Sequence, residues 1–107
     1  METPQRHMLN DLEGLRALVA SPPEPVDLAW TKQVCIRTRR LVHAFVIAPV
    51  ERDRMKEVRD LIDRAIGAFA PAAASSKDMG QRFSNIECRR EVIDRLLSGK
   101  TLVFLGL

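Results

Sequence analysis

The sequence predicts an all-α fold: an irregular bundle of about four helices with an apolar C-terminal tail. Three observations predict it. Apolar residues recur at alternating steps of three and four over residues 50–69, which is typical of an amphipathic helix. Residues 26–48 contain no Gly, Pro or Asn at which a hairpin would turn. The composition, 46% apolar and 29% charged, is that of a globular protein.

The first helix is expected over residues 4–20. Thr3 and Pro4 form a start signal, because a hydroxyl side chain at the N-cap precedes proline at the first helical position. An apolar stripe follows at steps of four, three and four: Met8, Leu12, Leu15 and Val19. Gly14 is a mild penalty inside this helix. Three prolines within residues 21–25 then end it in a stiff connector.

The second helix is expected over residues 26–48, with an apolar arc on one side and a basic face on the other. The arc contains Trp30, Val34, Leu41 and Phe45, and the basic face contains Lys32, Arg39, Arg40 and His43. Residues 41–47 are also rich in β-branched and aromatic side chains, which favour strands. The alternative is therefore an α/β fold with strands near 41–47 and 101–106.

The third and fourth helices are expected over residues 50–69 and 84–98. The seam of the third helix is Met55, Val58, Ile62, Ala65 and Phe69. Residues 70–83 are largely small and polar, which predicts a flexible internal loop. Ser84 and Glu87 have the spacing of a capping box at the start of the fourth helix, and Gly99 is placed to end it.

The chain is expected to form a single domain, residues 1–107. No apolar run approaches the roughly 20 residues of a membrane span, and the first residues lack the pattern of a secretory signal. Two cysteines give no disulfide framework, so a cytoplasmic location is expected. The net charge of +3 is small, and the basic excess is concentrated in residues 25–48.

No motif for catalysis, cofactor binding or metal binding is present, and we expect none of these activities. Cys35 and His43 are eight residues apart, about 80° around a helix, so they do not share a face as zinc ligands do. Residues 98–101, Ser-Gly-Lys-Thr, resemble part of a phosphate-binding loop, but Asp94 stands where that motif requires glycine. The carboxylates of the third helix alternate with basic residues and indicate a solvated, ion-paired face.

The expected function is a small, non-enzymatic protein-interaction or regulatory module. The C-terminal tail contains five large apolar residues, which either fold across the bundle or bind a second copy or another protein. Arg89 interrupts the apolar face of the fourth helix, and arginine is enriched at interfaces. The candidate partner-binding residues, for a protein partner or a homo-oligomer such as a homodimer, are Arg89, Leu102, Val103, Phe104 and Leu105.

The alternative function is a nucleic-acid-binding regulator that uses the basic face of the second helix, Lys32, Arg39, Arg40 and His43. Arg82, Arg89 and Arg90 would add to this face. Phosphate contacts give sequence-independent affinity for nucleic acid. However, an aromatic content of 5% with no tyrosine provides few stacking platforms, and no helix-turn-helix spacing is visible. A solvated basic face with no ligand is the simplest interpretation of these residues.

Overall fold

The protein is described by a computed structural model over residues 4–48 and 50–99. Four helices follow one another: α1 (Pro4–Ala20), α2 (Leu28–Ile47), α3 (Arg52–Phe69) and, after a short 3₁₀ turn η1 (Ala70–Ala72), α4 (Lys77–Leu97). The predicted all-α bundle is thus confirmed, and these described residues contain no strand. The alternative strand at 41–47 is wrong, because these residues form the end of α2. The second alternative strand, 101–106, and the apolar tail lie outside the described residues.

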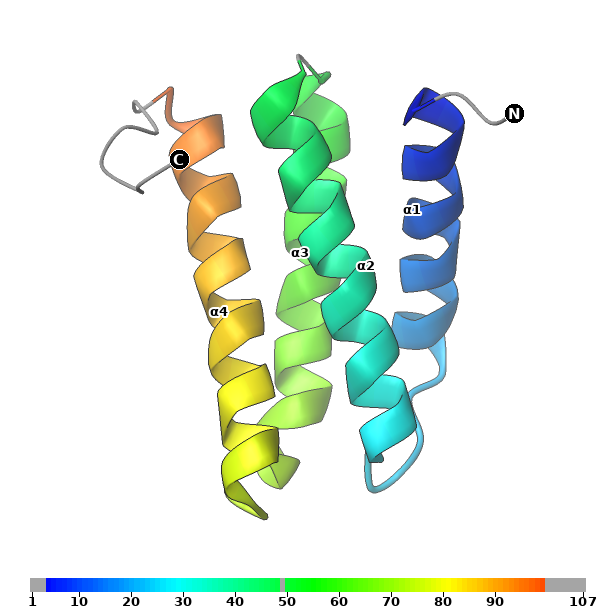
Figure 1. Cartoon of the computed structure of the whole chain (residues 1–107), viewed down its shortest axis with the longest axis vertical. Helices are drawn as coiled ribbons and strands as arrows, with labels where there is room; N and C mark the ends of the chain where they lie inside the picture. The colour runs from blue at the N-terminus through cyan, green and yellow to red at the C-terminus, as the bar shows by residue number, and fades with distance from the viewer. Residues whose placement is uncertain (1–3, 49, 100–107) are drawn as a thin grey trace.

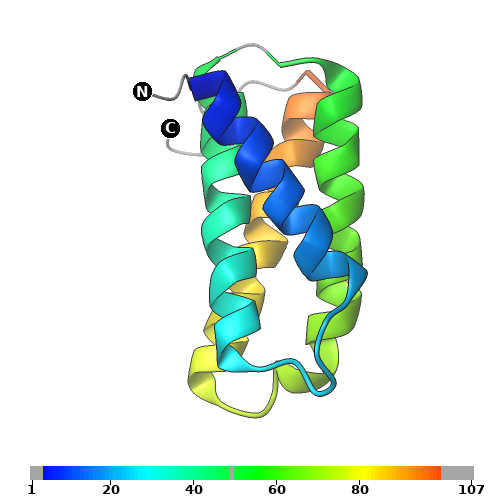
Figure 2. The same cartoon turned by 90° about the vertical axis from the view of Figure 1, so that its right-hand side faces the viewer.

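The helices form three layers. In Figure 1, α2 and α3 stand in the middle, α1 lies on one side of them and α4 on the other. Figure 2 shows α1 crossing diagonally over α2 and α3. The main contacts are those of α1 with α2, of α2 with α4 and of α3 with α4. Two neighbours in space, α2 and α4, therefore run in the same direction, with their N-terminal ends at one end of the molecule.

One buried face from each helix forms the core. The buried apolar residues share the helical spacing seen in the sequence, so that each helix turns one stripe inward. They include Leu12 and Leu15 of α1, Trp30, Val34, Leu41, Val42 and Phe45 of α2, Val58, Leu61, Ile62, Ala65 and Phe69 of α3, and Met79, Ile86, Ile93 and Leu97 of α4. The predicted seams of the first three helices thus match the buried residues closely.

An aromatic row ties the helices together at one end of the bundle. The indole Nε1 of Trp30 donates a hydrogen bond of 2.8 Å to the carbonyl oxygen of Leu18, near the C-terminal end of α1. The Trp30 ring lies 6.3 Å from that of Phe69 on α3, which lies 5.6 Å from that of Phe83 on α4. All four helices therefore meet through three side chains and one backbone carbonyl.

The second and third helices begin two residues later than predicted. Asp27 is the N-cap of α2, and its side chain accepts a hydrogen bond of 2.8 Å from the backbone N–H of Trp30. The helix accordingly begins at Leu28 rather than at Val26. Similarly, α3 begins at Arg52, after Glu51. At α2 the shift arises because the capping side chain of Asp27, and not the apolar pattern, decides the first helical residue. At α3 the N-cap Glu51 makes no side-chain capping hydrogen bond.

The fourth helix begins earlier than predicted. Residues 77–83, expected in the loop, form the first turns of α4, and the loop shrinks to η1 and a short turn. Ser76 is the N-cap, and its hydroxyl accepts a hydrogen bond of 3.1 Å from the backbone N–H of Met79. The capping box proposed at Ser84 and Glu87 is wrong, because both lie inside the helix. Met79 and Phe83 extend the apolar stripe backward from Ile86 by steps of three and four.

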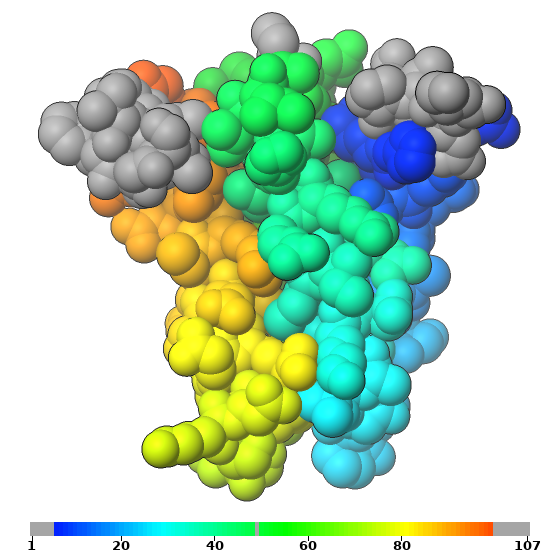
Figure 3. Space-filling view, viewed as in Figure 1, coloured from blue at the N-terminus to red at the C-terminus, as the bar shows by residue number. Residues whose placement is uncertain are grey.

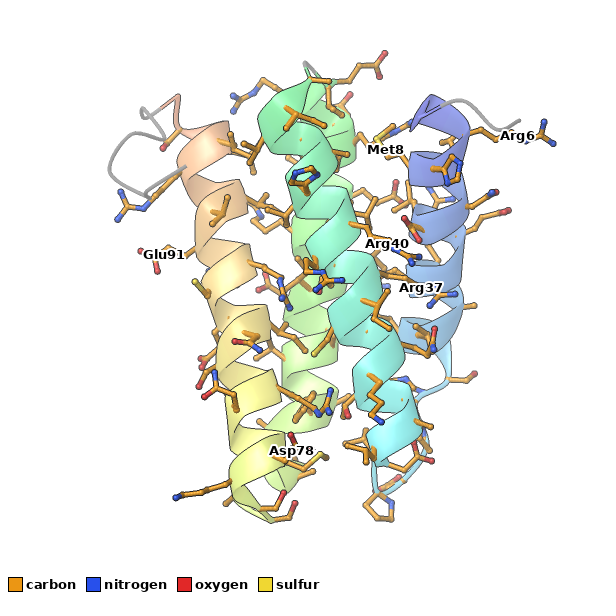
Figure 4. The ribbon with its side chains drawn as sticks, viewed as in Figure 1. Arg6, Met8, Arg37, Arg40, Asp78 and Glu91 are labelled. Atoms are coloured by element: carbon orange, nitrogen blue, oxygen red, sulfur yellow. The ribbon has the colours of Figure 1, made fainter. Side chains whose placement is uncertain are left out.

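Gly14 lies where α1 approaches α2. A Cβ atom at this position would clash with Nε of Arg37, so the missing side chain leaves the space that the arginine fills. Figure 4 shows Arg37 between the two helices. The glycine that the sequence marked only as a helix penalty thus permits a close side-chain contact between helices.

Gly99 ends α4, as predicted, and this gives a test of the fold. Its φ angle is +74°, and its N–H donates a hydrogen bond of 3.2 Å to the carbonyl oxygen of Leu96. We expect Gly99→Ala to lower the free energy of unfolding by about 1 kcal/mol, because L-residues disfavour this conformation.

Gly67 is the matched control, since it is an exposed glycine inside α3 with open space around it. Gly67→Ala should raise the free energy of unfolding by about 0.5–1 kcal/mol. Urea titration of both variants would contradict the assignment if Gly99→Ala were neutral or stabilising.

An ion pair joins α1 to α3 on the surface. Nε and Nη2 of Arg16 lie 2.6 and 2.8 Å from the two carboxylate oxygens of Glu57. The hydrogen bonds from Arg16 lower the pKa of Glu57 below its ordinary value. The positive charges of Arg16 and Arg54 lower this pKa further, and partial burial opposes the change. The folded state therefore binds the Glu57 proton more weakly than the unfolded state.

This pair predicts a change in the pH dependence of stability. A carboxyl with a depressed folded pKa stabilises the fold above its unfolded pKa, and this contribution is lost as the pH falls through the folded pKa. We expect Glu57→Gln to lose less stability than the unsubstituted protein between about pH 6 and pH 3. Urea unfolding across this range is the measurement. Glu24→Gln, at an exposed loop residue without an ion pair among the described residues, is the control. Parallel pH profiles for all three proteins would contradict the prediction.

Candidate anion-binding groove

The four basic residues predicted on α2 divide between two sides of the helix. Lys32 and Arg39 line a groove between α2 and α4. Arg40 turns instead toward α1, as Figure 4 shows, where its Nη1 lies 3.4 Å from Oδ1 of Asp11. His43 is exposed on the outer face of α2. The basic face is therefore not one patch, and only two of its members take part in the groove.

The groove between α2 and α4 is strongly basic. It has a volume of about 350 Å³ and is visible in Figure 3 as the furrow between the yellow-to-orange α4 and the cyan-to-green α2. Its walls are Lys32, Cys35, Ile36 and Arg39 from α2, and Arg82, Asn85 and Arg89 from α4. Four of these seven residues are cationic and none is acidic, so the groove attracts anions.

The cations are regularly spaced along both walls. Lys32 and Arg39 are seven residues apart, and so are Arg82 and Arg89. Seven residues make two helical turns, a rise of about 10.5 Å. Each wall therefore has two levels of positive charge, two turns apart. The contact of Cys35 with Arg82 sets the levels of the α4 wall nearly one turn farther along the groove than those of the α2 wall.

The α2–α4 seam has no cross-helix ion pair among the described residues, whereas three of the other four helix–helix seams have at least one; the smaller α2–α3 seam has none either. Arg16 pairs with Glu57 between α1 and α3, Arg40 with Asp11 between α1 and α2, and Arg90 with Asp63 and Arg59 with Asp94 between α3 and α4. In the groove, only Arg82 has a carboxylate partner, Asp78 on its own helix at 3.2 Å. The positive charge of the groove is therefore mostly uncompensated within the described part of the chain.

Arg89 is the most constrained cation of the groove. It is half-buried, and its Nη1 is shielded from solvent and has no hydrogen-bond partner in the described structure. A buried guanidinium nitrogen without a partner costs free energy, which an anion in the groove would recover. The sequence identified Arg89 as an unusual residue in an apolar arc, and the structure places it at the wall of a basic groove.

Cys35 lies on the groove wall between the arginines. Its Sγ is 3.8 Å from the carbonyl oxygen of Arg82. Burial raises the pKa of the Cys35 thiol above its ordinary value, and the positive charges of Arg89 and Arg82 partly offset this rise. The thiol is thus held in its protonated form, unlike the activated cysteines of thiol enzymes.

The groove has the residues to bind an anion but lacks a set for covalent chemistry. No histidine lines it, and no carboxylate is positioned as a base. Within residues 4–48 and 50–99, no group of three or more His, Cys, Asp or Glu side chains is arranged to hold a metal ion. None of the helices described is both long enough and apolar enough to cross a membrane.

The structure brings together residues from both sets that the sequence predicts as binding residues. Lys32 and Arg39 come from the basic face, and Arg89 comes from the partner-binding set. Arg82 is predicted only as an addition to the basic face, and Asn85 is not predicted. The signal for these two was their spacing, since residues 82, 85 and 89 recur at steps of three and four on one face of α4. The predicted partner-binding residues of the tail, 102–105, lie outside the described residues.

Comparison of the chain with protein families, with curated proteins and with solved structures found no significant match.

The environment of Cys35 predicts how its thiol titrates. In a Cys88→Ser variant, Cys35 is the only thiol, and its alkylation rate by iodoacetamide follows the thiolate fraction. We expect the midpoint of the rate-against-pH curve to lie above that of the same thiol in urea-unfolded protein. Arg89→Gln should raise it further, because the lost positive charge stabilised the thiolate. A folded-state midpoint at or below the unfolded one would contradict the assigned environment.

Proposed function

We propose that this chain is a non-enzymatic interaction or regulatory module that binds an acidic segment of a protein partner in the α2–α4 groove. One observation supports this most strongly. The groove gathers Lys32, Arg39, Arg82 and Arg89, and its seam has no cross-helix ion pair among the described residues, while three of the other four helix–helix seams have one. Arginine pairs well with carboxylates because its planar group donates two parallel hydrogen bonds.

A protein segment fits the groove better than an isolated small anion. The groove is open along its length, its cations stand on two levels, and Ile36 and Cys35 give its walls an apolar component. A chain of carboxylates on a backbone engages both levels at once, whereas a single small anion engages one. Electrostatic complementarity of this kind supplies specificity and rapid association.

The proposal also includes the setting in which the module works. Both cysteines are free, which suits a reducing, cytoplasmic compartment. The proposal also includes self-association as a homodimer, because the tail is apolar in sequence. It includes a contribution to partner binding from the tail residues Leu102, Val103, Phe104 and Leu105.

A nucleic-acid partner is the second candidate. The observation that favours it is a row of exposed basic side chains, Lys32, Arg39 and His43, along the outer face of α2 beside the groove. Phosphates would bind this row without regard to sequence. The Arg40–Asp11 pair draws one of the four basic residues predicted for this surface toward α1, which weakens this candidate relative to the first.

The test is direct binding of a fluorescein-labelled hexaglutamate peptide to the full chain, followed by anisotropy at low salt. We expect Arg39→Gln combined with Arg89→Gln to weaken binding by roughly tenfold or more, since each charge-assisted hydrogen bond contributes about 1.5–3 kcal/mol. Lys56→Gln combined with Arg64→Gln is the control, because it removes the same charge from exposed positions of α3.

The outcomes separate the two candidates. Binding that is lost in the groove variant and retained in the control variant supports the acidic-segment proposal. Equal weakening in both variants would reduce the effect to net charge alone and would contradict it. A labelled DNA duplex that binds more tightly than hexaglutamate, with affinity lost on Arg39→Glu plus Arg40→Glu, would favour the nucleic-acid candidate.

A further inference from the structure

Beyond the basic groove, apolar residues follow on the same two helices. On α4 the groove stripe of Arg82, Asn85 and Arg89 is followed, again at steps of three and four, by Val92 and Leu96. Both are only partly buried. On α2, Arg39 is followed seven and eight residues later by Val46, which is partly buried, and Ile47, whose exposed fraction is 69%. The seam is therefore basic toward the helix starts and apolar toward the helix ends.

This division restricts the form of the ligand. The platform consists of two helices, and the described residues offer no strand edge to which an extended peptide would add by backbone hydrogen bonds. A furrow between two helices instead accepts a third helix, whose side chains pack between the ridges of both. The levels of charge, two helical turns apart, match carboxylates seven residues apart on one face of such a helix.

We infer that the partner segment is an amphipathic helix, with carboxylates at one end of its binding face and large apolar side chains at the other. The carboxylates lie against Lys32, Arg39, Arg82 and Arg89, and the apolar side chains lie against Val46, Val92 and Leu96, beside Ile47. This inference rests on the proposed function and specifies the conformation and pattern of the acidic segment. The four cations of the groove favour an occupant that carries carboxylates. This indicates an acidic partner segment and not a purely apolar segment.

Two synthetic peptides of equal composition test it. The first has glutamates seven residues apart and leucines farther along the same helical face. The second contains the same residues in an order that scatters the glutamates and leucines around the helix. We expect the first peptide to bind the full chain at least about tenfold more tightly, because only it satisfies both halves of the seam, and to gain helicity by circular dichroism on binding.

Variants of the chain separate the two halves. Ile47→Asn should weaken the first peptide about threefold or more while leaving hexaglutamate binding unchanged, since this exposed side chain lies at the apolar end. Leu9→Asn is the control, because Leu9 is an exposed apolar residue of α1, away from the groove. Arg89→Gln should weaken both ligands. Retained affinity of the first peptide for Ile47→Asn, or an equal loss in Leu9→Asn, would overturn the assignment of the apolar half.

The remaining outcomes distinguish this inference from the proposed function. If hexaglutamate binds and the two peptides bind equally, the helical partner is wrong and the acidic-segment function stands. If no acidic ligand binds, the proposed function itself fails. If the first peptide binds only when the tail carries Phe104→Ser and Leu105→Ser, the groove is occupied by the tail of this chain. If the protein is a dimer that dissociates when the first peptide is added, the groove is occupied by a second copy. Either result would overturn the inference.

Discussion

The position of Trp30 is the constraint on which the rest of the bundle depends. Its indole N–H is bonded to the end of α1, and its ring leads through Phe69 of α3 to Phe83 of α4. A buried Trp requires both apolar contacts and a hydrogen-bond acceptor, so few other arrangements of these helices satisfy it. The row fixes the start of α2 beside the start of α4. From that point the two helices run in the same direction, and the thiol of Cys35 meets the backbone carbonyl of Arg82, the residue next to Phe83, across the seam.

The groove follows from this alignment. Once the starts of α2 and α4 are fixed, the cations that recur every seven residues on each helix must face one another, and the like charges repel. Three of the other four seams place carboxylates opposite arginines, as Glu57 does for Arg16 and Asp63 does for Arg90. A seam of like charges is less stable than a paired one, and this cost is one of the observations behind the binding surface that we propose.

The sequence predicted much of the fold because helical periodicity is a local property. The stripes of α1, α2 and α3 follow the 3.6-residue period and bury the residues that the pattern selects. The start of α4 was mispredicted because Ser84 and Glu87 have capping-box spacing, while the true cap, Ser76, lacks an acidic residue three positions later. Small residues before Met79 masked the early part of its stripe. Capping depends on which hydroxyl can accept a hydrogen bond from the helix, and the sequence offers Ser75, Ser76 and Ser84 as candidates near this helix start.

The site was less predictable because it belongs to two helices at once. The basic residues of α2 were visible in the sequence, but Arg39 and Arg40 lie about 100° apart on the helix and meet different neighbours. Only the packing decides that Arg40 meets Asp11 on α1, while Arg39 faces Arg82 and Arg89 on α4. No pattern within one helix indicates that α2 lies beside α4 rather than across the core from it.

The uncompensated charge connects stability with binding. A ligand that binds only the folded state raises the free energy of unfolding by an amount set by its concentration and affinity. Under the function that we propose, an anion in this groove would also satisfy the buried Nη1 of Arg89 and relieve the repulsion between the two walls, both of which are costs of the unliganded fold. The residues that weaken the α2–α4 seam in the free protein would then strengthen it in the complex with an acidic segment. The proposal therefore makes this seam the part of the bundle whose stability responds most directly to an anionic ligand.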